Sequence, residues 1–442
     1  MEDSTNEISK IGPIYNQYIR NLESIEVFFN KLSHKALEED KSILIAQKKY
    51  FEDSLRSTLG DEVYERFKAK LESEENGIID IADESQNEDI DKSIEPEEAT
   101  VEIIDKQESD KIPKEKIDAF FYKIFQAPKI QTKNFEILSN GTFLMLNNYF
   151  EYLFADLLSF HFTNNKNIIE EKNISISLSE LKNFSTIEEA YKDLLFKEIE
   201  KLLLDLNFEE LKEYFKKLGI SLAEDFINWD LINEIRERRH LIVHNNAIVN
   251  QKYLNKSKNI CNLNIGDNVN IENDYLKNAI DEVLFAGALL IFNCWGKWDK
   301  VYASDAISEI VDLTFELLKR KNYSLVNRTC EYVEKMIKPR NEKEETYLLN
   351  INFNHCIALK RISKKKELNS KLENIRVGNL TPIYKLAKSV LIEDSEGIKN
   401  VFNQAIIVDD LIIDQYFEWP LFEDLRNNEE LHKFCISQFE TN

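Results

Sequence analysis

Residues 231–246 read LINEIRERRHLIVHNN, and this stretch decides how we interpret the chain. On a helical wheel of about 100° per residue, its large aliphatic residues fall on a single stripe: Ile232, Ile235, Ile242 and Val243. Arg239 falls in the middle of this stripe, with His240 and His244 at its rim. A guanidinium keeps its charge when buried and therefore needs a partner. The pattern indicates either a functional site or a structural arginine that pairs with an interior carboxylate.

The composition favours an all-α protein. The chain has 442 residues, enough for two or three domains, but only 10 glycines and 7 prolines. Turn-rich β folds and glycine-rich phosphate loops need more of both residues. Hydrophobic residues make up 43% of the chain, which is ample for ordinary cores.

The negative charge is concentrated in one segment. The whole chain carries a net charge of −23, and residues 71–110 contribute sixteen Asp or Glu against two Lys, a charge of −14. We expect residues 72–113 to form a disordered acidic linker, with mimicry of a phosphate backbone as the alternative. The rest of the chain is only modestly acidic, so local basic patches that bind RNA remain compatible with its composition.

The sequence lacks the motifs that mark several classes of protein. The five cysteines form no CxxC pair, which argues against a disulfide framework and a zinc site. The Walker, nucleophile-elbow, zincin and dinucleotide-binding motifs are missing, and we expect neither a cofactor nor a metal. Residues 1–10 are polar, and the longest apolar run, Val283–Phe292, is about half of what a membrane span needs. A cytoplasmic protein without a membrane segment is expected.

Apolar periodicity divides the chain into four regions. Residues 1–71 are expected to form a helical hairpin, with one helix ending near Leu32 and a second beginning near Lys41. After the linker, residues 114–300 form a domain with helices at about 141–162, 186–206, 208–218, 229 onward and 275–294. Its segment 261–271 alternates apolar and polar residues and could be briefly extended. Residues 301–442 are helical again, with a spacing that hints at tetratricopeptide-like hairpins.

The segment Arg239-His240-Leu241-Ile242-Val243-His244-Asn245 resembles the signature of the HEPN superfamily, in which a histidine follows an arginine after four residues. The stretch from Arg238 to Leu254 and the long apolar helix that follows are similar as well. The resemblance covers about residues 133–298. It implies an up-and-down helical domain that dimerises so that two copies of the motif face each other, and many members are metal-independent endoribonucleases.

For such an enzyme we assign catalytic roles to Arg239, His244 and His240, and substrate contacts to Arg236 and Asn245. His244 would take the proton of the RNA 2′-OH as general base, and Arg239 would stabilise the charge on the phosphate. Residues five apart on a helix diverge by about 140°, so one straight helix cannot easily close both groups on one phosphate. A site shared across a homodimer solves this problem.

The leading interpretation is an endoribonuclease that acts as a toxin or an anti-phage effector and whose C-terminal region could hold a protein partner. The rival interpretation is a non-catalytic HEPN scaffold that dimerises and binds a nucleotide or a protein. A third is a helical adaptor in which the Arg/His cluster is structural. Arg236 and Arg238 could be ordinary solvated charges, and the basic run 360–366 could bind RNA or be a solvated face.

Overall fold

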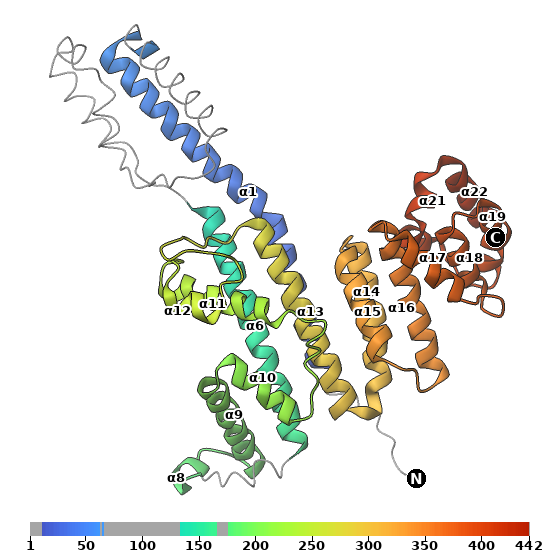
Figure 1. The fold of residues 1–442 in the computed structure, drawn as a ribbon, viewed down its shortest axis with the longest axis horizontal. Coiled ribbons are helices and arrows are strands. Elements are labelled where there is room, and N and C mark those ends of the chain that lie inside the picture. The colour runs from blue at the N-terminus through green and yellow to red at the C-terminus, as the bar shows by residue number, and fades with distance from the viewer. Residues whose placement is uncertain (1–10, 62–63, 66–132, 166–175, 442) are drawn as a thin grey trace. The chain divides into compact units, whose positions relative to one another are not determined.

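The computed structural model describes residues 11–61, 64–65, 133–165 and 176–441, and within these ranges the chain is helical with no β-strand. The predicted all-α class is therefore confirmed. The expected acidic linker lies outside the described residues. The chain forms two compact units: one comprises residues up to Val27 and from Asn140 onward, and the other comprises Phe28–Ser139. Figure 1 shows the order of the helices along the chain.

The first helix corrects the prediction of an N-terminal hairpin. Helix α1 runs without interruption over Ile11–Leu59, straight through residues 33–40, where a turn was expected. These eight residues include no glycine or proline, and their Ala, Leu, Glu and Lys favour a helix. The helix ends at Gly60, whose φ of 87° lies in the left-handed region that glycine adopts most easily.

The unit Phe28–Ser139 contains the second half of α1 and the beginning of α6, which spans Asn134–Asn164. The Asp40 carboxylate of α1 accepts hydrogen bonds from the backbone N–H groups of Asn134, at 3.0 Å, and Phe135, at 2.9 Å. These groups have no partner within the helix, so Asp40 acts as an N-cap supplied from another helix. The rings of Phe29 and Phe135 also meet, with centroids 6.1 Å apart.

The larger unit is built around α13, Asn273–Trp298, which is buried along most of its length. Among the described residues it is the one helix long and apolar enough to cross a membrane, but 83% of its apolar window is buried inside the protein. Such burial is typical of a core helix in a soluble protein. The start of α1 packs against it: the ring of Tyr15 meets that of Phe292 at a tilt, with centroids 5.4 Å apart, and the Tyr18 hydroxyl donates to the Val283 carbonyl at 2.6 Å.

Helices lie where periodicity predicted them: α6, α9 (Ile187–Asp205), α10 (Phe208–Lys217) and α11 (Trp229–His244). Two short helices were not expected, α8 (Leu178–Leu181) and α12 (Gln251–Lys256). The segment expected to be extended forms one isolated antiparallel bridge, Ile248 with Asn268, rather than a strand.

The C-terminal region is a series of packed helices. They are α14 (Ala303–Lys319), α15 (Tyr323–Met336), α16 (Glu342–Arg361), α17 (Lys365–Asn374), α18 (Pro382–Leu391), α19 (Ser395–Ile407), α20 (Ile413–Glu418), α21 (Glu423–Asn427) and α22 (Glu429–Thr441), with the 3-10 turns Lys300–Tyr302 and Pro420–Phe422. Helix α14 packs against α15 and α16, and α18 packs against α19 (Figure 1). Because α13 also contacts α14 and α15, the central and C-terminal regions share one packed interior.

The contact between α1 and α13 depends on Gly287. A Cβ atom at this position would lie 2.2 Å from the Tyr18 hydroxyl oxygen, and both residues are buried. We expect Gly287→Ala to cost about 1–3 kcal/mol of unfolding free energy, because the Tyr18 ring cannot move away without disturbing the core. Chemical denaturation of the purified protein measures this loss.

The matched control is Gly296→Ala, on the same helix, where nothing lies within 4 Å of the added Cβ. This exposed substitution should leave stability unchanged or raise it by up to about 1 kcal/mol, since alanine favours the helix more than glycine does. Equal stability of the two variants would show that Tyr18 does not seat on Gly287.

Candidate active site

Helix α11 carries all the residues of the Arg/His motif, and its start is well determined by the sequence. The Asn228 side chain caps the helix by accepting a hydrogen bond from the backbone N–H of Leu231 at 3.1 Å. The helix ends at Asn245, whose side-chain amide donates to the Ile248 carbonyl at 2.5 Å. The contacts of Asn245 therefore show it ending the helix, and the substrate contact expected from the sequence stays a prediction.

The buried face of α11 differs from the face expected from the sequence. Ile232 and Ile235 are buried as predicted, but Val243 is 48% exposed. The interior positions further along the helix are taken by Glu234, Arg238 and Leu241 instead. Arg239 is consequently not centred on a buried apolar stripe, and that expectation is wrong.

The buried arginine of this helix is Arg238, at 6% exposure, and its neighbour Glu234 is fully buried. The Arg238 Nε donates to Glu234 Oε1 at 2.7 Å, and its guanidinium lies 3.9 Å from the centre of the Tyr275 ring. The hydroxyls of Tyr253 and Tyr275 each donate to Glu234 at 2.6 Å. The expectation that Arg238 is a solvated charge is thus corrected. We call Glu234, Arg238, Tyr253 and Tyr275 the buried cluster.

The buried cluster joins three helices. Tyr253 belongs to α12 and Tyr275 to α13, so the carboxylate of Glu234 ties α11 to both. Burial and the neighbouring Glu234 raise the pKa of both tyrosine hydroxyls, which therefore remain protonated and able to donate. Charge and hydrogen-bonding capacity are matched inside the protein, which is the condition for burying an ion pair without a large penalty.

Because Arg238 points inward, Arg239 lines a surface hollow of about 520 Å³. Arg236 and Phe208 also line this hollow, which we call the Arg239 hollow. The Arg239 side chain is 31% exposed, and its Nη2 lies 4.0 Å from Glu151 Oε2 on α6. The Arg236 Nη2 lies 3.6 Å from the other oxygen of the same carboxylate, and its guanidinium covers the Phe208 ring at 4.3 Å. Two guanidinium groups thus share one partly exposed carboxylate.

His244 lines a second, smaller hollow of about 140 Å³, the His244 hollow, together with Asn245. His240 and Glu237 line both hollows. The ring centroids of His240 and His244 are 4.5 Å apart, and both histidines are exposed. Desolvation and the nearby His244 lower the pKa of His240. The divergence expected between Arg239 and His244 is therefore present in one protomer, and His240 stands between them.

The first two residues of the basic run 360–366 have a structural role. Lys360 pairs with Asp424 at 2.9 Å, and Arg361 pairs with the same carboxylate at 2.7 Å. Lys364 contacts Glu367 at 3.2 Å. The pairs of Lys360 and Arg361 with Asp424 tie the end of α16 to α21, whereas Lys365 and Lys366 are exposed.

The buried cluster predicts that neutralising a buried carboxylate of α11 destabilises the protein far more than neutralising an exposed one. Glu234→Gln removes the charge that compensates Arg238, so we expect a loss of about 3–5 kcal/mol of unfolding free energy. Asp230→Asn, on the same helix, breaks only the exposed pair with Lys258, at 2.6 Å, and should cost less than about 1 kcal/mol. Thermal unfolding of the two variants compares these effects, and equal melting temperatures would contradict the structural role of the cluster.

Comparison of the chain with models of known protein families, with curated proteins and with solved structures gave no match. The interpretation of this site consequently rests on its geometry and on the motif in the sequence. The geometry brings Arg236 and Arg239 together in one hollow, His240 and His244 together as a pair, and Asn245 beside His244.

Proposed function

We propose that this chain is a metal-independent endoribonuclease of the HEPN type, with Arg239, His240 and His244 at its active site. The observation that carries the proposal is the exposed histidine pair, whose rings lie 4.5 Å apart and of which His240 also lines the hollow that holds two arginines. A structural cluster would bury these groups or saturate them with partners, as the protein does one residue earlier at Arg238.

The chemistry needs a proton acceptor, a proton donor and a cation. The 2′-oxygen of RNA attacks the adjacent phosphorus, its proton passes to an imidazole, and the bond from phosphorus to the 5′-oxygen breaks. The leaving 5′-oxygen takes a proton from the second imidazole, which gives a 2′,3′-cyclic phosphate and a 5′-hydroxyl.

The lowered pKa of His240 refines the assignment of roles. The sequence suggested His244 as the base, but a lowered pKa leaves the His240 imidazole unprotonated at neutral pH and ready to accept a proton. We therefore propose that the pair works as a unit, in which one ring accepts and the other donates. Arg239 and Arg236 supply the cations, and the RNA phosphate takes the place of the Glu151 carboxylate between them.

Since Arg239 and His244 line different hollows of one protomer, we propose that a second copy completes the site. The exposed Val243 lies on the outer face of α11 between these residues in sequence, and gives a dimer an apolar contact at this position. The biological setting that we propose is the degradation of cellular RNA by a toxin or an anti-phage effector. A HEPN scaffold that dimerises without cleaving RNA is the second candidate, favoured by the ion pairs that Glu151 makes with both arginines.

Cleavage of RNA tests the proposed chemistry. His240→Ala, His244→Ala and Arg239→Ala should each lower the cleavage rate by about 100-fold or more, the usual contribution of one acid–base or oxyanion group. The control is His34→Ala, an exposed histidine on α1 that pairs with Glu38 at 3.5 Å, and its activity should equal that of the wild type. Gel electrophoresis and mass spectrometry follow the fragments, which should end in a 2′,3′-cyclic phosphate and form in excess EDTA.

Circular dichroism establishes that each variant is folded, since all three substituted side chains are partly or fully exposed. Full activity in both His244→Ala and Arg239→Ala would refute the proposed active site, and a wild-type protein that leaves RNA intact would favour the scaffold.

Dimerisation has its own test. Val243→Glu places a charge on the outer face of α11 and should convert a dimer into a monomer that cleaves RNA poorly, with little change in melting temperature. The matched control is Val301→Glu, because Val301 is a valine exposed to 86% that lies far from the motif in sequence. Light scattering at micromolar concentration reports the mass, and a wild-type monomer with full nuclease activity would refute the shared site.

A further inference from the structure

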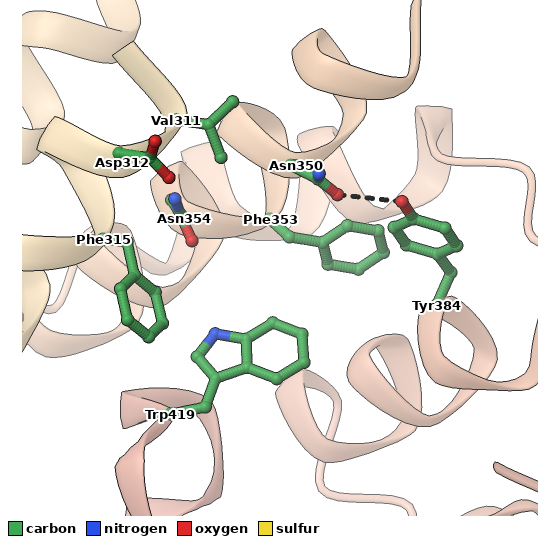
Figure 2. A pocket seen from close by; sticks show the side chains of 8 residues that line it. All are labelled: Val311, Asp312, Phe315, Asn350, Phe353, Asn354, Tyr384 and Trp419. Carbon is green, nitrogen blue, oxygen red and sulfur yellow. Dashed lines mark hydrogen bonds between the residues drawn. The ribbon is translucent and has the colours of Figure 1, made fainter. Parts of the chain in front are cut away.

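A second hollow, far from the motif in the sequence, lies among the C-terminal helices (Figure 2). Its volume is about 240 Å³. Aromatic side chains from three helices and one connection surround it: Phe315 of α14, Phe353 of α16, Tyr384 of α18 and Trp419, which follows α20. The rings of Phe353 and Tyr384 are stacked, with centroids 5.6 Å apart, and the Tyr384 hydroxyl donates to Asn350 Oδ1 at 2.9 Å.

The polar lining of this aromatic hollow offers hydrogen-bond acceptors. The Asn354 side-chain amide donates to Thr314 Oγ1 at 2.9 Å, and Figure 2 shows its oxygen on the side that faces Trp419. Asp312 contributes a carboxylate that forms no ion pair with the described residues. A ligand that donates hydrogen bonds from a flat, positively charged group would satisfy these acceptors.

The negative charge along α14 also favours a positively charged ligand. Four carboxylates lie along α14: Asp305, Glu309, Asp312 and Glu316. Glu316 has a lysine partner at 3.0 Å, and Asp305 has one at the outer limit of an ion pair, at 4.0 Å. Burial and the adjacent Glu316 raise the pKa of Asp312, so the position is one where a negative charge is in excess. A cation bound there would relieve this repulsion.

We infer that the aromatic hollow binds the guanidinium group of an arginine side chain from a partner protein. A guanidinium stacks on aromatic faces and forms forked hydrogen bonds with a carboxylate, and this hollow supplies both. Its volume is below the roughly 300–1,000 Å³ typical of sites for whole small molecules, and it suits one side chain instead. The inference does not depend on the proposed nuclease activity, because it concerns different residues and a different ligand.

Binding to one side chain should be weak, with a dissociation constant of about 1 mM. The full chain is labelled with fluorotryptophan, and the fluorine resonance of Trp419 is assigned as the one that disappears in Trp419→Phe. A short capped peptide with one arginine should shift this resonance in a saturable way. The same peptide with citrulline, which keeps the shape but lacks the charge, should not shift it.

Asp312→Asn tests the carboxylate and should weaken arginine binding about tenfold, the value of one hydrogen bond to a charged group. The matched control is Glu309→Gln, one turn earlier on α14, because Glu309 does not line the hollow. This variant should bind as the wild type does. Equal shifts with arginine and citrulline, no saturable shift of the Trp419 resonance, or unchanged binding in Asp312→Asn would each overturn the inference.

A peptide with lysine in place of arginine, and choline as a small cation, are further arms of the experiment. Both should bind more weakly than the arginine peptide, because neither presents a planar fork to the carboxylate. Choline that binds as tightly as the arginine peptide would overturn the assignment to a side chain.

Discussion

The ion pair between Glu234 and Arg238 is the constraint on which the rest of the site depends. It lies inside the protein, and the hydroxyls of Tyr253 and Tyr275 complete its hydrogen bonds, so α11 can occupy only one rotation about its axis. That rotation turns the next residue, Arg239, and the two histidines toward the surface. An interaction that contributes to stability thereby determines which charged groups are accessible to a ligand. Neighbouring arginines in one helix thus have opposite environments, one enclosed by partners and the other open at a hollow.

The position of α11 was predictable from the sequence, but its rotation was not. Asn228 and the apolar residues at helical spacing mark the start and extent of the helix. The helical wheel, however, took the inner face from the aliphatic residues alone, and here Glu234 and Arg238 are inside because they neutralise each other. Their spacing of four residues and opposite charges are visible in the sequence. The tyrosines that complete the cluster come 15 and 37 residues after Arg238, and only the fold reveals that they converge on Glu234.

The long first helix illustrates a different limit. Apolar spacing placed helices on both sides of residues 33–40, and the missing turn signal in that stretch favoured one continuous helix, as the structure has it. The aromatic hollow could not have been found from periodicity either. Phe315, Phe353, Tyr384 and Trp419 each belong to a separate segment, and each alone is indistinguishable from an ordinary core residue. Local patterns identify helices well, whereas sites built by several helices depend on packing that no single segment encodes.

The contact between Tyr18 and α13 affects when the protein can fold during translation. The Tyr18 hydroxyl bonds to a carbonyl 265 residues further along the chain. At a synthesis rate of about 10 residues per second, the first helix waits roughly half a minute on the ribosome before its partner emerges. During that interval its apolar face, with Tyr15, Tyr18 and Leu22, has no α13 to cover it. The native core therefore closes late in translation, and until then this face is open to contacts other than its native ones.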